Sequence, residues 1–258
     1  MKTTWLFLLF FVGLINTIFT CEAQQVKHLG SDTAKAIMLT AAYAFQLPGA
    51  DMHKRFGYNG NVGSGVWYKT KQNYLLGLDA CFLFGNTINE DSIAYNVSTN
   101  EGWIIGNDGY PANLNFFERG FMTTAKVGKL FVLNPKQPNA GIVTMLGLGY
   151  MQHKIKIEDK NEVAYQFIND YVKGYDRLTS GLMLSQFIGY MYLDKRKRIN
   201  FYIGAEFVQG FTKAQRQLNF DTFTNDTNYQ RKDLLYGLKV GWILPLYTKS
   251  DEASYYYN

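Results

Sequence analysis

The connections between the strand-like segments of this chain alternate between short basic ones and long polar ones. The short connections are residues 69–73, 134–139 and 194–200, and the long ones surround residues 47–61, 86–119, 156–178 and 213–231. A soluble β-sandwich has no reason to keep such an alternation, whereas a barrel that crosses a membrane has short turns on one side and long loops on the other. The alternation therefore predicts an all-β, up-and-down transmembrane barrel.

Eight segments show the period-two alternation of a strand, near residues 33–46, 62–70, 73–85, 120–133, 141–155, 179–193, 199–212 and 232–247. Each is long enough for a tilted membrane strand, which needs about 9–11 residues. An even number of strands places both ends of the barrel on the periplasmic side. We expect an eight-stranded antiparallel barrel over residues 33–247, with short periplasmic turns and long extracellular loops.

The same alternation assigns each strand residue to the lipid or to the barrel interior. Four ionisable residues fall on the inward face by parity alone, and they are Asp79, Lys126, Glu206 and Lys239. Two acids and two bases can neutralise one another, whereas a charge facing lipid at mid-depth would cost about 2–4 kcal/mol. We expect a salt-bridge network that plugs the narrow interior, and the alternative is a gated polar path or a catalytic carboxylate. Gln186 interrupts an apolar outward face, and the pattern does not place it.

The first residues have the layout of a secretory signal peptide, in which Lys2 precedes the apolar run 5–15 and Ala23 follows. We expect residues 1–23 to be a signal peptide and residues 24–32 a periplasmic segment. Cys21 leaves two alternatives, because residues 18–21 partly resemble the box in which a lipoprotein cysteine is lipidated. If Cys21 leaves with the signal peptide, Cys81 is the only mature cysteine, and an intramolecular disulfide is excluded.

The composition suits a membrane barrel. Aromatic residues make up 16% of the chain, a surplus that girdles at the two membrane interfaces would use. The mean hydropathy of −0.18 does not exclude a barrel, because its strands are apolar on one face only. After Ala23 no stretch approaches 18 consecutive apolar residues, so we expect no transmembrane helix.

The formal net charge of +5 is concentrated in the short connections. Nucleic-acid binding would need basic and aromatic residues interleaved on one surface, so no nucleic-acid partner is expected. We expect instead a basic periplasmic rim that either stays solvated or contacts acidic lipid head groups or an acidic protein. Its residues are Lys69, Lys71, Lys136, Lys195, Arg196, Lys197 and Arg198.

The end of the chain suggests a family. Residues 239–247, Lys-Val-Gly-Trp-Ile-Leu-Pro-Leu-Tyr, resemble the C-terminal signal that barrel-assembly machinery reads. We expect strand pairing to stop at Pro245, and residues 248–258 to form a periplasmic tail that is either frayed or docks a partner. With its signal peptide and alternating strands, the chain resembles the small, porin-like outer-membrane β-barrel proteins of Gram-negative bacteria. The resemblance implies an outer-membrane location among outer-membrane lipids, and no site residues.

The second long loop carries the best candidate contact surface. An Asn-Asp-Gly turn at residues 107–109 lies between apolar flanks, which indicates a small hairpin. The hairpin either stands above the membrane or folds over the barrel mouth as a lid. Exposed apolar clusters often mark interaction sites, so we expect either a contact patch or a self-packed loop. Its residues are Trp103, Ile104, Ile105, Phe116 and Phe117.

Enzyme chemistry has little support in the sequence. His153, expected at the outer rim beside Glu158 or Asp159, is the only arrangement that a barrel hydrolase could use. We expect no enzymatic activity, no cofactor and no metal site. The leading hypothesis is an accessory or structural subunit of an outer-membrane secretion or assembly complex, in contact with other outer-membrane or periplasmic proteins. The alternative is a surface binding protein or conduit for a small or apolar solute.

Overall fold

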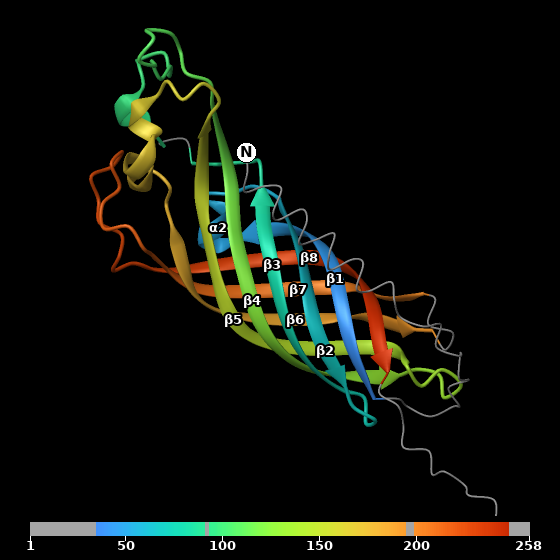
Figure 1. The fold of residues 1–258 in the computed structure, drawn as a ribbon. Helices are drawn as coiled ribbons and strands as arrows, with labels where there is room; N and C mark the ends of the chain where they lie inside the picture. Colours follow the sequence, from blue (N-terminus) through green and yellow to red (C-terminus); the bar gives the residue numbers. More distant parts are fainter. Residues whose placement is uncertain (1–34, 91–92, 195–198, 248–258) are drawn as a thin grey trace, which may run out of the picture. The chain divides into compact units, whose positions relative to one another are not determined.

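The computed structural model describes residues 35–90, 93–194 and 199–247, and in them eight antiparallel strands close into a barrel (Figure 1). The strands pair in chain order, and β1 closes the ring against β8. Their bounds are β1 (Ala36–Gly49), β2 (Asn59–Lys69), β3 (Tyr74–Gly85), β4 (Leu114–Val132), β5 (Ala140–Asp159), β6 (Thr179–Leu193), β7 (Asn200–Ala214) and β8 (Gln230–Tyr247). The predicted all-β, eight-stranded up-and-down barrel is confirmed.

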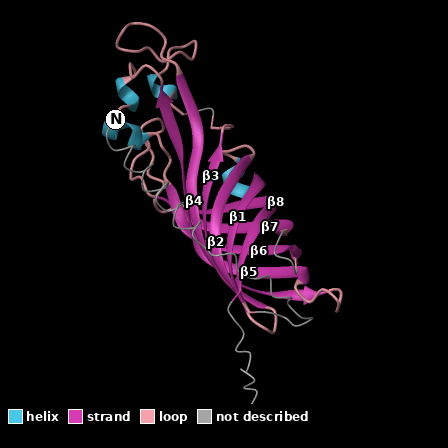
Figure 2. Cartoon of the chain, turned by 45° about the vertical axis from the view of Figure 1, so that its right-hand side comes forward, coloured by secondary structure: helices cyan, strands magenta, loops and turns pink. Residues whose placement is uncertain are grey.

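Short turns join the strands at one end of the barrel and long loops join them at the other, as Figure 1 shows. We call these the short-turn end and the long-loop end. The long loops carry the four-residue helix α2 (Ala50–His53) and the 3-10 helices η1 (Tyr95–Val97), η2 (Tyr165–Phe167) and η3 (Asn169–Gly174) (Figure 2). Among the described residues, no helix is both long enough and apolar enough to cross a membrane.

Several expectations fall on residues outside the described part of the chain. They are the signal peptide at residues 1–23 with Cys21, the segment 24–32, the tail 248–258, and Lys195, Arg196, Lys197 and Arg198 of the third short turn. These remain predictions from the sequence.

The alternation of faces follows the predicted parity. Leu78, Leu146 and Leu238 point outward with 63–69% of their surface exposed, while Asp79 and Glu206 on the opposite faces are buried. The register is continuous around the ring, so one shift of a single residue would turn every apolar side chain of a strand inward. The apolar outer belt and the buried inner face are therefore set together by the period-two sequence.

Several strand boundaries differ from the prediction, and the largest differences are in β4 and β5. β4 begins at Leu114 rather than at residue 120, and β5 continues to Asp159, so that Leu114 pairs with Asp159 in a long hairpin. Strand pairing also continues past Pro245, which lies opposite Met38 of β1. The predicted stop at Pro245 is therefore wrong, because β8 runs on to Tyr247 and stays paired with β1.

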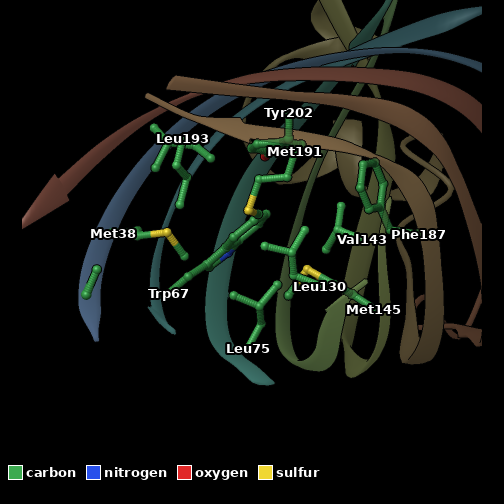
Figure 3. Close-up of a cluster of buried hydrophobic side chains, with 12 residues drawn as sticks. Met38, Trp67, Leu75, Leu130, Val143, Met145, Phe187, Met191, Leu193 and Tyr202 are labelled. Carbon is green, nitrogen blue, oxygen red and sulfur yellow. The ribbon is translucent and has the colours of Figure 1, made fainter. Parts of the chain in front are cut away.

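The interior at the short-turn end is filled by apolar side chains (Figure 3). Glycines opposite the large rings make room for them. A Cβ at Gly77 would lie 2.5 Å from Trp67 Cδ1, and one at Gly241 would lie 2.3 Å from the Tyr202 ring. The two rings face each other with centroids 4.9 Å apart, and Figure 3 shows Trp67, Tyr202 and Met191 meeting in the lumen. Small residues next to large ones are the usual means of filling a small barrel.

A second apolar cluster fills the interior toward the long-loop end. Strand residues such as Leu83, Met122 and Met151 contribute to it, together with Met52 and Phe56 from the first long loop. All of these side chains are buried. The polar layer described next therefore lies between two apolar layers.

Candidate functional site

The structure brings the four predicted lumen residues together. Lys126 Nζ lies 2.8 Å from Asp79 Oδ2 and 3.0 Å from Glu206 Oε1, and Lys239 Nζ lies 2.9 Å from the same Glu206 oxygen. All four side chains are at most 5% exposed. Trp67 Nε1 also donates a hydrogen bond of 2.6 Å to Asp79. The two acids and two bases thus form one neutral network across the barrel, which fits a plug rather than an open path.

The first long loop, and not the second, covers the barrel mouth. Met52 of α2 and Phe56 just after it are fully buried in the second apolar cluster, at the long-loop end of the lumen. Asp51 fixes α2 to the barrel, because its carboxylate accepts a 3.0 Å hydrogen bond from the backbone N–H of Lys232. A hydrogen bond from Lys54 lowers the pKa of Asp51. Two apolar residues four positions apart in an otherwise polar loop are the signal that could have identified this closure.

The four long loops, residues 50–58, 86–113, 160–178 and 215–229, are joined by buried ion pairs, and we call them together the cap. Arg55 Nε lies 3.2 Å from Glu90, and Arg177 Nε lies 3.0 Å from the other oxygen of Glu90. Arg177 also pairs with Asp221, and Arg55 donates to Thr179 at the start of β6. These contacts join one residue from each loop, and no periodic pattern in the sequence predicts them.

The geometry of Arg177 shows how tightly the cap is specified. Its φ of 49° lies in the left-handed region, which side chains other than glycine seldom adopt. Both of its acidic partners, Glu90 and Asp221, hold the guanidinium in place. Burial lowers the pKa of Arg55 to about 10, so Arg55 stays protonated at neutral pH and keeps its ion pair.

A further ion pair joins the third and fourth loops of the cap. Arg216 donates to both carboxylate oxygens of Asp176, at 2.9 and 2.6 Å. The hydrogen bond with Asp176 raises the pKa of Arg216. A bidentate pair of this kind fixes orientation as well as distance. The cap also has a small apolar core of its own, formed by Ala94, Ala164, Phe167 and Tyr175.

The predicted contact patch is divided. Trp103 and Ile105 are exposed, but Ile104 packs against the apolar core of the cap. Phe116 packs against the second apolar cluster. Phe117 points outward, and the guanidinium carbon of Arg119 lies 4.7 Å from the centroid of its ring. The extra length of β4 explains the separation, because it places residues 116 and 117 on opposite faces of a strand.

The predicted turn at residues 107–109 is present. Gly106 donates to Tyr110 at 2.8 Å, and Ile105 pairs with Pro111. The turn packs sideways onto the third loop, since Asn107 donates to the carbonyl of Val163 at 2.9 Å. It therefore contributes to the cap and is not the lid over the barrel mouth.

The histidine arrangement expected for a hydrolase is wrong. His153 is fully buried, and its Nε2 lies 2.9 Å from Asp233 across the lumen. Thr212 donates to the same Asp233 oxygen at 2.5 Å. Glu158 instead lies 3.7 Å from Lys156, and Asp159 accepts backbone hydrogen bonds in the loop that follows. The histidine has a structural partner and lies inside the barrel, because the curvature of the sheet brings β5 and β8 within reach.

The basic rim is only partly a surface. Lys71 and Lys136 are exposed in the first and second short turns. Lys69 is the exception, because it shares the inward face of β2 with Trp67 and is fully buried. Its Nζ donates a 2.9 Å hydrogen bond to Asn139 of the second turn. Lys69 therefore closes the short-turn end from inside, and assigning it to a solvated rim was wrong.

These features define the class of the protein. Its outward face is a belt of exposed apolar and aromatic side chains, and the ionic network lies inside a closed sheet. Such a surface is stable only against lipid, where closure of the barrel satisfies every backbone group. The chain is an eight-stranded β-barrel with the outward face of a membrane protein. In the described part of the chain no group of acidic, histidine and cysteine side chains has the arrangement of a metal site.

No family model and no curated protein matches the sequence. Among solved structures, the chain is similar to Neisserial surface protein A, with 8% identity and a TM-score of 0.42 over 81% of this chain and 96% of that chain. It is similar to Ail, the attachment invasion locus protein of Yersinia pestis, with 11% identity and a TM-score of 0.39 over 81% and 98%. It is also similar to the outer membrane protein OprG of Pseudomonas aeruginosa, with 12% identity and a TM-score of 0.38 over 83% and 97%.

Proposed function

We propose that this chain is a non-enzymatic, non-conducting outer-membrane barrel that acts as an accessory or structural subunit of an outer-membrane complex through its cap. The observation that carries the proposal is the set of buried ion pairs joining all four long loops, from Arg55 through Glu90 and Arg177 to Asp221. Loops that only connect strands do not need such a set. Loops that present a fixed surface to a partner do, because preorganisation lowers the entropy lost on binding.

The outer surface of the cap has the composition of a protein-binding surface. Large aromatic side chains stand exposed on an ordered framework, where Tyr, Trp and Phe supply most of the energy of protein contacts. They are Tyr95, Trp103, Tyr110, Tyr165, Tyr171 and Phe223, each with more than half of its surface exposed. A partner that covered them would bury apolar area that is now in water.

The experiment is purification from native membranes in mild detergent. We expect a stoichiometric protein partner with the wild-type chain, and loss of that partner with the Trp103→Ala/Tyr110→Ala double variant. The matched control is Tyr74→Ala, which removes an exposed aromatic side chain at the short-turn end. A wild-type protein that elutes alone, or a double variant that keeps its partner, would refute the subunit role.

A second candidate function is binding of a small or apolar solute at the cell surface. Trp103 and Ile105 favour it, because both are exposed beside the 107–109 turn. Binding of an apolar fluorophore to intact cells, lost in Trp103→Ala but not in Tyr74→Ala, would support this role even where no protein partner co-purifies. The conduit form of this hypothesis predicts discrete conductance steps in planar bilayers, and the plugged lumen argues against them.

A further inference from the structure

Two glutamines on neighbouring strands break the apolar outer belt. Gln186 of β6 and Gln209 of β7 both lie on outward positions, with Gln186 opposite Phe207 and Gln209 opposite Leu184. Their amides form a reciprocal pair, with N–H···O distances of 3.4 and 3.3 Å. In the sequence Gln186 interrupts an apolar outward face, and in the structure Gln209 lies beside it.

The pair lies in the part of the sheet that faces hydrocarbon. Gln186 stands between Leu184 and Ile188, and Gln209 stands between Phe207 and Phe211. These four flanking side chains are 36–54% exposed on the outer surface. Apolar outward side chains therefore flank both glutamines along their strands.

The reciprocal pair leaves hydrogen-bonding capacity unused. Each amide has two N–H donors and an oxygen with two acceptor sites, and each uses one donor and one acceptor site in the pair. The remaining N–H groups and lone pairs face the lipid, which offers no partner. Amide side chains in membranes satisfy this need by hydrogen bonding to a neighbouring transmembrane element.

We propose that the outer face of β6 and β7 is a contact surface for a second copy of this chain, with Gln186 and Gln209 at its centre. The choice of a second copy follows from the chemistry of the amide, which carries equal numbers of donors and acceptors and is complementary to itself. A two-fold axis beside the pair would place the unused groups of one copy against those of the other. Leu184, Ile188 and Phe207 around the pair would supply apolar packing. This contact is in the membrane plane and does not depend on the role proposed for the cap.

The test is the oligomeric state of the purified full-length protein in lipid vesicles, measured by energy transfer between two labelled populations as protein is diluted into lipid. We expect the wild type to self-associate, and the Gln186→Leu/Gln209→Leu variant to need at least tenfold more protein per lipid for the same transfer. The matched control is Ser64→Ala, a change from polar to apolar at an exposed outward position of β2. It should associate as the wild type does.

A heat-modifiable gel shift must show that every variant still forms the barrel. A wild-type protein that stays monomeric at all densities would overturn the proposal, and so would a double-leucine variant that associates as well as the wild type. A different protein cross-linked at Gln186 in native membranes, with no second copy, would also overturn it. A wild-type protein that self-associates but co-purifies with no other protein would refute the proposed function alone, so the two can fail separately.

Discussion

Removal of one acid from the lumen network should destabilise the barrel strongly, and Glu206→Leu is the sharpest case. Glu206 accepts from both Lys126 and Lys239, at 3.0 and 2.9 Å. Without Glu206, Lys239 loses this ion pair, and within the network Asp79 alone remains to balance two buried ammonium groups. Leaving a buried charge without compensation costs about 3–5 kcal/mol of unfolding free energy.

The same reasoning gives the opposite result for a paired removal. Glu206→Leu/Lys239→Met deletes one acid and one base, and it leaves Lys126 with Asp79 at 2.8 Å. The residual network is neutral, and replacing a buried ion pair by apolar side chains is often neutral or stabilising. We expect the double variant to lie within about 2 kcal/mol of the wild type, whereas the two single losses would sum to about 6–10 kcal/mol.

The assay is reversible urea unfolding in lipid vesicles, followed by tryptophan fluorescence, for the wild type, both single variants and the double variant. A coupling free energy of several kcal/mol would support a network whose main requirement is local neutrality. Additive losses would refute that reasoning, because they would mean that each side chain contributes through packing alone. The same conclusion would follow if Glu206→Leu unfolded at the same urea concentration as the wild type.

Three further outcomes follow from the structure. Gly77→Ala should destabilise the barrel by about 1–3 kcal/mol in urea unfolding, because the added methyl group would overlap the Trp67 ring. Arg177→Met should leave barrel unfolding unchanged but increase cleavage of the long loops in limited proteolysis, because it separates the loops that carry Glu90 and Asp221. Since its pKa is lowered on folding, Asp51 stabilises the fold above about pH 4, and this contribution is lost as the pH falls through the lowered value. Protection of the Lys232 backbone amide from hydrogen exchange should fall over the same pH range, because this amide donates to the Asp51 carboxylate.

The lumen network could be predicted from the sequence because strand parity is a local rule. Once the register placed Leu78 in lipid, Asp79 had to point inward, and the same held for Lys126 on β4. The same parity rule, applied to β2, puts Lys69 on the inward face with Trp67, although the sequence analysis assigns Lys69 to the basic rim. The error at Lys69 came from grouping the basic residues of the short connections together without assigning a face to this strand end.

The cap could not be predicted in this way. Arg55, Glu90, Arg177 and Asp221 come from four loops with no shared period, and their contacts depend on where the barrel brings those loops. Pairs of this kind are set by closure of the sheet, as is the contact between His153 and Asp233, 80 residues apart. Local patterning specifies a barrel strand by strand, and side chains across the ring meet only after closure.

The packing of the lumen limits which parts of the barrel can contact other molecules. The neutral ionic network lies between two apolar layers. The apolar layer at the short-turn end contains two large rings that fit only because glycines lie opposite them, Gly77 opposite Trp67 and Gly241 opposite Tyr202. Opening a path would require both apolar layers to unpack and the neutral network between them to separate, and close-packed interiors do not deform continuously. The interior is therefore closed by packed layers. The proposed roles accordingly use surfaces that stay exposed after folding, namely the cap and the outward side that carries Gln186 and Gln209.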